Sequence, residues 1–195
     1  MLLTAATLAA LVAPTAAGAA TPGLSRTAGT RLVRLNPGDQ VAVSGTNLHC
    51  SSSRQTPITL ACGKGTARGP SAGTYGFALA DAAALVLRVG ASGQSSVVLR
   101  RRQPASAGQA APAHAASARS IVAGTDTVIL VSGTHLVCAV SAQSGGNAIT
   151  CGLSGPAAGT FQTGTFFTIL TDTTVLLGRK AAAGAQSVFR HAQPR

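Results

Sequence analysis

Aromatic and acidic residues are scarce in this sequence of 195 residues. Tryptophan is absent, and one Tyr and five Phe make up only 3% of the chain. Glutamate is absent as well, so four aspartates supply all of the acidic side chains. A core must therefore be built from aliphatic residues, which a hydrophobic share of 46% can provide. The shortage of carboxylates leaves few candidates for general acid and base catalysis.

Motifs for a cofactor, a metal or a glycan are also missing. The stretch Gly63-Lys64-Gly65-Thr66 has the glycines of a phosphate-binding loop but lacks the rest of that motif. No Asn-x-Ser/Thr glycosylation site occurs. The four histidines show no metal-ligand spacing, and we interpret them as surface or turn residues: His49, His114, His135 and His191. We therefore expect no cofactor and no metal.

The N-terminus has the pattern of a secretory signal peptide. Residues 2–20 are uncharged and consist mostly of Leu, Ala, Val and Thr, with small residues at the end. Such a run predicts cleavage after Ala19 or Ala20. An N-terminal membrane anchor is the alternative, but Pro14 and Gly18 disfavour a spanning helix of about 20 residues. We expect a secreted or envelope-associated protein with no stable membrane span.

A long internal match indicates that one unit occurs twice. Val43-Ser44-Gly45-Thr46-Asn47-Leu48-His49-Cys50 returns as Val131-Ser132-Gly133-Thr134-His135-Leu136-Val137-Cys138, and a Cys-Gly pair follows each copy. A match this long and nearly in register predicts a duplication. The expected organisation is a signal peptide at 1–20, a leader at 21–30, a first repeat at 31–104, an Ala/Pro-rich linker at 105–118 and a second repeat at 119–195.

Both repeats are predicted to be all-β. Short alternating segments are separated by Gly, Pro and Ser turns, and no stretch shows sustained helical periodicity. We expect two tandem, homologous β-sandwich-like or barrel-like repeats, each small enough to need a covalent staple. Disulfides Cys50–Cys62 and Cys138–Cys151 are the one connectivity of three that leaves each repeat self-contained. The spacing of these cysteines is wrong for a metal site.

One pair of matched strands differs in side-chain size between the repeats. Gly76 and Ala78 in the first repeat correspond to Phe167 and Ile169 in the second. Both faces of the second strand are then apolar, so we expect Phe167 and Ile169 to be buried. The small face of the first repeat is one candidate for the cover.

The basic charge suggests a class of partner. Fifteen Lys and Arg against four acids give a net charge of +11. A positive surface favours a polyanion such as nucleic acid, an acidic cell-wall polymer or an anionic surface, although solubility alone is an alternative reason for the charge. Basic residues are not interleaved with aromatics, so no base-stacking platform is predicted. The candidate binding surface consists of six arginines at strand ends, which can also protect strand edges from pairing: Arg88, Arg100, Arg101, Arg102, Arg179 and Arg190.

The predicted function is a non-enzymatic binding or interaction module for a polyanion or another protein. We name no catalytic residue. One alternative is a secreted hydrolase with a site between the repeats that uses Asp81 or Asp172, since paired carboxylates can act as acid and base. Both aspartates follow alternating strands, where Asp commonly bonds the backbone of its own turn, and we favour that role. A secreted inhibitor is the third possibility. The sequence does not determine the oligomeric state, nor whether the two repeats form one fused domain or two.

Overall fold

The computed structural model describes residues 30–66, 69–106, 108–155 and 160–195. The predicted signal peptide, and the leader up to residue 29, lie outside these residues. Within them, all regular secondary structure is β, which confirms the predicted class. No helix in the described part of the chain is long and apolar enough to cross a membrane.

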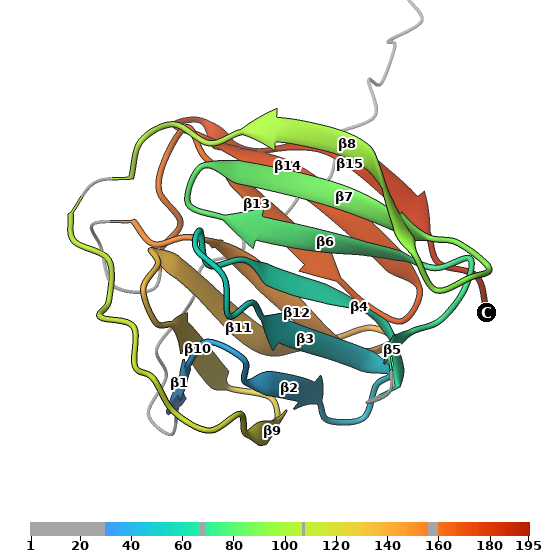
Figure 1. The fold of residues 1–195 in the computed structure, drawn as a ribbon. Coiled ribbons are helices and arrows are strands. Elements are labelled where there is room, and N and C mark those ends of the chain that lie inside the picture. The colour runs from blue at the N-terminus through green and yellow to red at the C-terminus, as the bar shows by residue number, and fades with distance from the viewer. Residues whose placement is uncertain (1–29, 67–68, 107, 156–159) are drawn as a thin grey trace, which may run out of the picture.

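Fifteen strands are described, and they form two sheets (Figure 1). In chain order the strands are β1 (Arg31–Leu35), β2 (Gln40–Val43), β3 (Leu48–Ser52), β4 (Leu60–Thr66), β5 (Gly69–Pro70), β6 (Tyr75–Ala80), β7 (Ala83–Val89), β8 (Ser95–Arg102), β9 (Ser120–Ala123), β10 (Thr127–Val131), β11 (Leu136–Gln143), β12 (Gly146–Leu153), β13 (Phe166–Leu170), β14 (Thr174–Ala181) and β15 (Gly184–Ala192). Sheet A has the order β1-β10-β11-β12-β13-β14-β15. Sheet B has the order β8-β7-β6-β4-β3-β2-β9, with the short β5 paired to β4.

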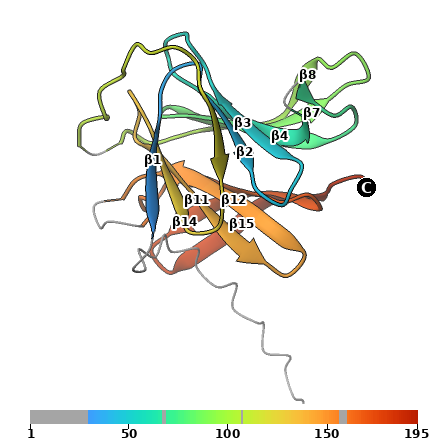
Figure 2. The ribbon, with the colours of Figure 1, turned by 90° about the horizontal axis from the view of Figure 1, so that it is seen from below.

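The two sheets pack face to face around one core (Figures 1 and 2). A single cluster of buried side chains draws on both sheets and includes Phe77 of β6 and Leu177 of β14, each with no exposed surface. The structure differs here from the expected pair of small sandwiches, because 31–104 and 119–195 each supply most of one layer. Alternation along every strand sends one set of side chains inward, and these aliphatic residues can be shielded from water only when the layers meet.

Both predicted disulfides are present within this core. Cys50 and Cys62 lie directly opposite each other on β3 and β4, and Cys138 and Cys151 do the same on β11 and β12. All four cysteines are buried, and the described residues contain no free cysteine. Two intramolecular disulfides agree with folding in an oxidising compartment.

We call residues 31–104 the first stretch and residues 119–195 the second stretch. The first strand of each stretch belongs to the sheet that the other stretch mostly forms. β1 pairs in parallel with β10, so it belongs to sheet A although the strands that follow it form sheet B. β9 pairs in parallel with β2 and belongs to sheet B, although its successors form sheet A. The chain therefore passes from one sheet to the other at the turn that follows each of these strands. Figure 2 shows β1 beside the strands of the lower sheet.

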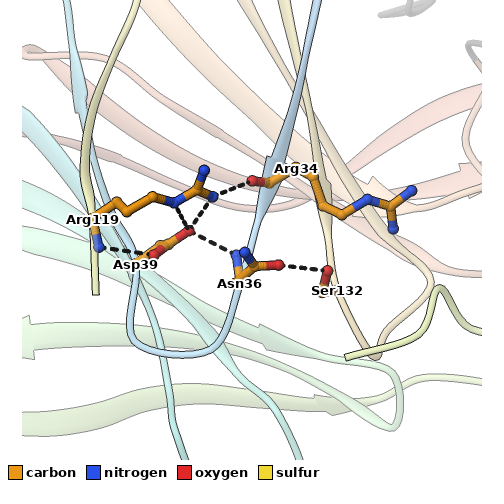
Figure 3. A network of polar contacts seen from close by, with 5 residues as sticks. All are labelled: Arg34, Asn36, Asp39, Arg119 and Ser132. Atoms are coloured by element: carbon orange, nitrogen blue, oxygen red, sulfur yellow. Dashed lines mark hydrogen bonds and ion pairs between the residues drawn. The ribbon is translucent and has the colours of Figure 1, made fainter. Parts of the chain in front are cut away.

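A polar network holds this exchange in place (Figure 3). The Asn36–Asp39 turn carries the chain from β1 to β2, and the Asp39 carboxylate accepts hydrogen bonds from the backbone N–H of Asn36 and of Arg119. The Arg119 guanidinium donates to Asp39 and to the carbonyl of Arg34. Ser132 donates from its hydroxyl to the Asn36 side-chain oxygen at 3.0 Å. The network thus joins the β1–β2 turn to the residue that precedes β9 and to the end of β10.

Two buried glutamines connect the sheets at the opposite end of the sandwich. The Gln193 side chain accepts from the backbone N–H of Tyr75 at 2.8 Å and donates to the Tyr75 carbonyl at 2.6 Å. The Gln103 side-chain oxygen accepts from the backbone N–H of Phe166 at 2.8 Å. Each glutamine follows an outermost strand of one sheet, β8 or β15, and binds the first residue of an inner strand in the other. The two contacts are therefore reciprocal.

The larger side chains of β13 are buried as predicted, but their cover is different. Phe167 is 3% exposed, and Ile169 is partly buried in the same small cluster on the outer face of sheet A. Phe161, which precedes β13, stacks on Phe167 with 5.8 Å between ring centroids. The first stretch does not supply the cover, because Gly76 faces outward from sheet B on the other side of the molecule. Phe161 was overlooked because it lies outside any alternating segment.

Candidate functional site

The six candidate arginines lie on two hairpins, one at the end of each sheet. We call these the basic hairpins: β7–β8 (83–102) in sheet B and β14–β15 (174–192) in sheet A. Together they hold seven of the 15 basic residues and none of the four acidic residues. All six arginines are exposed. β8 and β15 are also outermost strands of their sheets, so the arginines on them sit where charge prevents edge-to-edge pairing.

The strand register divides these arginines between two faces. Arg101 lies opposite the buried Ala84, whereas Arg100 lies opposite the half-buried Leu85 on the other face. Residues directly opposite each other in an antiparallel pair project to the same side of the sheet. By the same rule, three arginines lie on the side of the facing sheet, namely Arg88, Arg101 and Arg179. The other three lie on the outer faces, namely Arg100, Arg102 and Arg190.

Three aromatic rings gather beside Arg88, one of the inward-facing arginines, a feature that the sequence prediction missed. Tyr75 stacks on His191 with ring centroids 4.2 Å apart, and Phe189 lies 6.3 Å from Tyr75. The Arg88 guanidinium carbon lies 5.9 Å from the centre of the Tyr75 ring, within the range of a cation–π contact. Basic and aromatic groups are therefore neighbours in space although they are not interleaved in the sequence. The sequence signal that could have indicated this contact is that the rings and Arg88 all occupy inward-facing positions on strands near one end of each sheet.

None of the aspartates neutralises the basic hairpins. Asp39 is fully buried, and its ion pair is with Arg119, at 2.6 Å. Burial by itself would raise the pKa of Asp39, but hydrogen bonds from Arg119 and from the Asn36 backbone, together with the positive charge of Arg119, hold that pKa below its ordinary value. Asp39 raises the pKa of Arg119 in return. In the described residues the six candidate arginines make no ion pair, so their charge faces solvent uncompensated.

Asp81 and Asp172 bind the backbone of the opposite stretch rather than their own turns. The Asp172 carboxylate accepts from the backbone N–H of Asn47 at 3.0 Å. The Asp81 carboxylate accepts from the backbone N–H of His135 at 2.9 Å, and its other oxygen lies 2.8 Å from Nδ1 of the same residue. Asn47 and His135 occupy matching places in the Ser-Gly-Thr stretches. The favoured local turn role was therefore wrong about the partner, although the carboxylates do cap backbone amides.

The other candidate groups have ordinary surroundings. In the described ranges, no group of three or more His, Cys or Asp side chains is placed to hold a metal ion. Gly69-Pro70-Ser71-Ala72-Gly73 matches the letters of the Gly-x-Ser-x-Gly pattern of some hydrolases. It covers β5 and the turn into β6, not the strand-to-helix turn that exposes a nucleophilic serine. His49 lies half-buried on β3, and His114 is exposed between the stretches.

Comparisons with known proteins add no family. No protein-family model, no curated protein and no solved structure matches the chain. Its function is therefore inferred from its own residues.

Proposed function

We propose that the protein is a non-enzymatic module that binds a polyanion at the basic hairpins. The observation that carries this proposal is the group of six exposed arginines without an acidic partner, set on two hairpins that contain no carboxylate. Guanidinium groups pair well with phosphate, sulfate and carboxylate oxygens, and an extended polymer can contact several of them together. The Tyr75, Phe189 and His191 rings would offer an apolar surface beside Arg88.

Salt sensitivity is the physical signature of such binding. Each phosphate neutralised on a nucleic acid contributes about 0.7 to 0.9 to the slope of log affinity against log salt. If all six arginines engage, raising salt from 50 to 200 mM should lower affinity roughly 300- to 2,000-fold. Binding driven by apolar contact or by one specific pocket would change far less.

The test compares two triple variants of the mature chain. Arg100→Ser, Arg101→Ser and Arg102→Ser remove three charges from the basic hairpins. Arg31→Ser, Arg34→Ser and Arg54→Ser remove the same charge from exposed positions on β1 and the β3–β4 loop. Heparin, a single-stranded 20-mer DNA and vesicles of anionic lipid serve as probes, each titrated at several salt concentrations.

We expect the Arg100/Arg101/Arg102 variant to bind DNA more weakly, with a slope of log affinity against log salt that is smaller by about two to three. We expect the Arg31/Arg34/Arg54 variant to change little in either affinity or slope. Equal losses in both variants would show that net charge alone is responsible. Weak or salt-independent binding of all three probes by the parent protein would refute the proposal. Which probe binds best assigns the chemical class of the polyanion.

We also infer that the two stretches arose by duplication. The matched segments supply matched contacts: Asp81 and Asp172 both cap backbone amides in the opposite Ser-Gly-Thr stretch, and Gln103 and Gln193 both bind the opposite inner strand. Such reciprocal contacts are typical of a two-fold arrangement of like units. Homologous repeats would therefore meet as two halves of one sandwich.

Secretion completes the proposed function. The N-terminal apolar run and the two disulfides both support export to an oxidising compartment. Mass spectrometry of protein recovered from the producing cells tests this directly. We expect a mature chain that begins at residue 20 or 21 and lacks free thiols, whereas an uncleaved, reduced chain would contradict the location.

A further inference from the structure

The outer faces of the two sheets differ at one row of residues. In sheet A, the row across β12, β13 and β14 is Gly152–Phe167–Gly178. In sheet B, the corresponding row across β4, β6 and β7 is Gly63–Gly76–Leu87. One aromatic ring thus stands at the centre of the first row, and a glycine stands at the centre of the second.

In sheet A, side chains of the protein itself fill this position. The Phe167 ring lies over Gly178 so closely that a Cβ at Gly178 would collide with it. Phe161 stacks on Phe167 with the two planes 4° from parallel. Both rings are more than nine-tenths buried. The face of a β-sheet with glycines in its rows can therefore accommodate a stacked ring in this fold.

In sheet B, the same place is a hollow of about 160 Å³. Ala61, Gly63 and Gly76 line it together with the side chains of Pro70 and Leu87. The hollow is enforced by the backbone, because a Cβ at Gly76 would collide with the carbonyl oxygen of Cys62. An apolar cavity of roughly 150 Å³ is large enough to take up benzene. The volume thus suits one six-membered ring.

The rim of this hollow offers hydrogen-bonding groups. Gln40 on β2 and His49 on β3 both line it. Neither side chain makes a hydrogen bond within the described residues, so both are available to a ligand. In sheet A, the residue that occupies the row position of His49 is the apolar Val137. The polar rim is therefore particular to the unfilled side.

We propose that this hollow binds a small, uncharged aromatic molecule of the phenol class. Its ring would lie over Gly63 and Gly76 and against Pro70, and its hydroxyl would hydrogen-bond to His49 or Gln40. The proposal does not depend on polyanion binding, because none of the six candidate arginines lines the hollow. It rests on the unfilled row, the matched volume and the free polar groups of the rim.

The experiment is a titration of the full mature protein with phenol, followed by amide chemical shifts in NMR. We expect saturable shifts centred on Gly63, Gly76 and Leu87. Cyclohexanol, which has a similar volume and a hydroxyl but no planar ring, should bind at least about tenfold more weakly because it cannot lie flat over Gly63 and Gly76. Toluene, which has no hydroxyl, tests the polar rim. We expect His49→Ala to weaken the binding of phenol but to leave the binding of toluene unchanged.

A filling variant provides the decisive comparison. At Gly63 a new Cβ would lie 3.6 Å from the nearest side-chain atom, that of Pro70, which is ordinary van der Waals contact, and Gly63→Val would extend its methyl groups into the hollow. Gly124→Val is the matched control, since a Cβ at Gly124 would have no atom within 4 Å and this residue lies far from the row in the sequence. We expect Gly63→Val to weaken phenol binding at least about tenfold and Gly124→Val to leave it unchanged.

Three results would overturn the proposal. Shifts that fail to saturate, or that spread over the whole surface, would mean non-specific contact only. Equal binding by Gly63→Val and the parent would move the site elsewhere. Equal affinity for cyclohexanol and phenol would show that the hollow does not select aromatic rings. Polyanion titrations of Gly63→Val separate the two proposals, since its affinity for heparin or DNA should be unaffected.

Discussion

Replacing Asp39 with asparagine should destabilise the fold at the point where the first strand crosses between sheets. The Asp39 carboxylate accepts four hydrogen bonds: from Asn36 N at 2.9 Å, and from Arg119 N, Nε and Nη2 at 2.9, 3.2 and 2.6 Å. Its surface is fully buried. Asp39→Asn keeps the size of the side chain but turns one acceptor oxygen into a donor.

The expected cost is about 2 kcal/mol at pH 7. Whichever way the amide is oriented, at least one N–H that Asp39 satisfied must face another N–H, and an unsatisfied buried donor costs about 1–3 kcal/mol. The remaining bonds lose the negative charge that strengthens them. The full penalty of about 3–5 kcal/mol for a broken buried pair does not apply, because the Arg119 side chain is 50% exposed and water can solvate it.

The effect should also depend on pH in a defined direction. Because the folded pKa of Asp39 lies below its ordinary value, its stabilisation is present above the unfolded pKa, about 3.9, and is lost as pH falls through the folded pKa. Urea unfolding at pH 7, 5 and 2.5 measures this. The difference in the free energy of unfolding between the parent and Asp39→Asn should be the same at pH 7 and pH 5 and should become smaller at pH 2.5.

The control is Asp126→Asn, which removes the same charge from an exposed turn. Asp126 has a positive φ of 64°, which asparagine tolerates, so its loss should change stability by less than about 0.5 kcal/mol. If Asp39→Asn were as mild as this control at pH 7, the network would not stabilise the crossing. A cost that stayed constant from pH 7 to 2.5 would refute the assignment to the ionised carboxylate.

Two further predictions concern the interior. Gln193→Ala should lower the free energy of unfolding in urea by about 2 kcal/mol and Gln103→Ala by about 1 kcal/mol, because Gln193 makes two hydrogen bonds to the Tyr75 backbone and Gln103 makes one to the Phe166 backbone. The reverse order would show that these hydrogen bonds do not set the contribution of each glutamine. Cys138→Ala with Cys151→Ala should lose about 3 kcal/mol in the loop-closure model, and the parent protein should lose at least as much on reduction. A thermal transition unmoved by the double substitution would show that the disulfide is not a staple.

Much of the fold was predictable because its signals are local. The alternation of Tyr75, Phe77 and Leu79 indicates a strand with one buried face, and the matched cysteines indicate which neighbours pair. The exchange of β1 and β9 has no local signal. β1 is mostly exposed, with only Leu35 fully buried, and its pairing partner Val131 lies 96 residues further along the chain. Its choice of sheet depends on the assembled core.

The candidate site was predictable in its charges and not in its neighbours. Arg88 and Arg179 stand at matched strand ends, so their recurrence could be seen in the sequence. Tyr75 and His191 are 116 residues apart, and only the packing of the two sheets brings their rings into contact. The hollow on sheet B was missed for a related reason. A sequence shows that Gly76 is small, but only the register of three strands shows that the row through Gly76 contains no aromatic residue.

The crossing of β1 and β9 sets an order on how the molecule can be made. When a ribosome has produced residues 31–104, β1 has no partner, because β10 has not yet been synthesised. The vacant side of β2 likewise waits for β9. The first half can therefore form hairpins and its disulfide but cannot finish either layer. The two sheets can therefore be completed only after both β1 and β10, and both β2 and β9, have been synthesised. We expect nascent chains that stop before residue 131 to be readily digested by proteases.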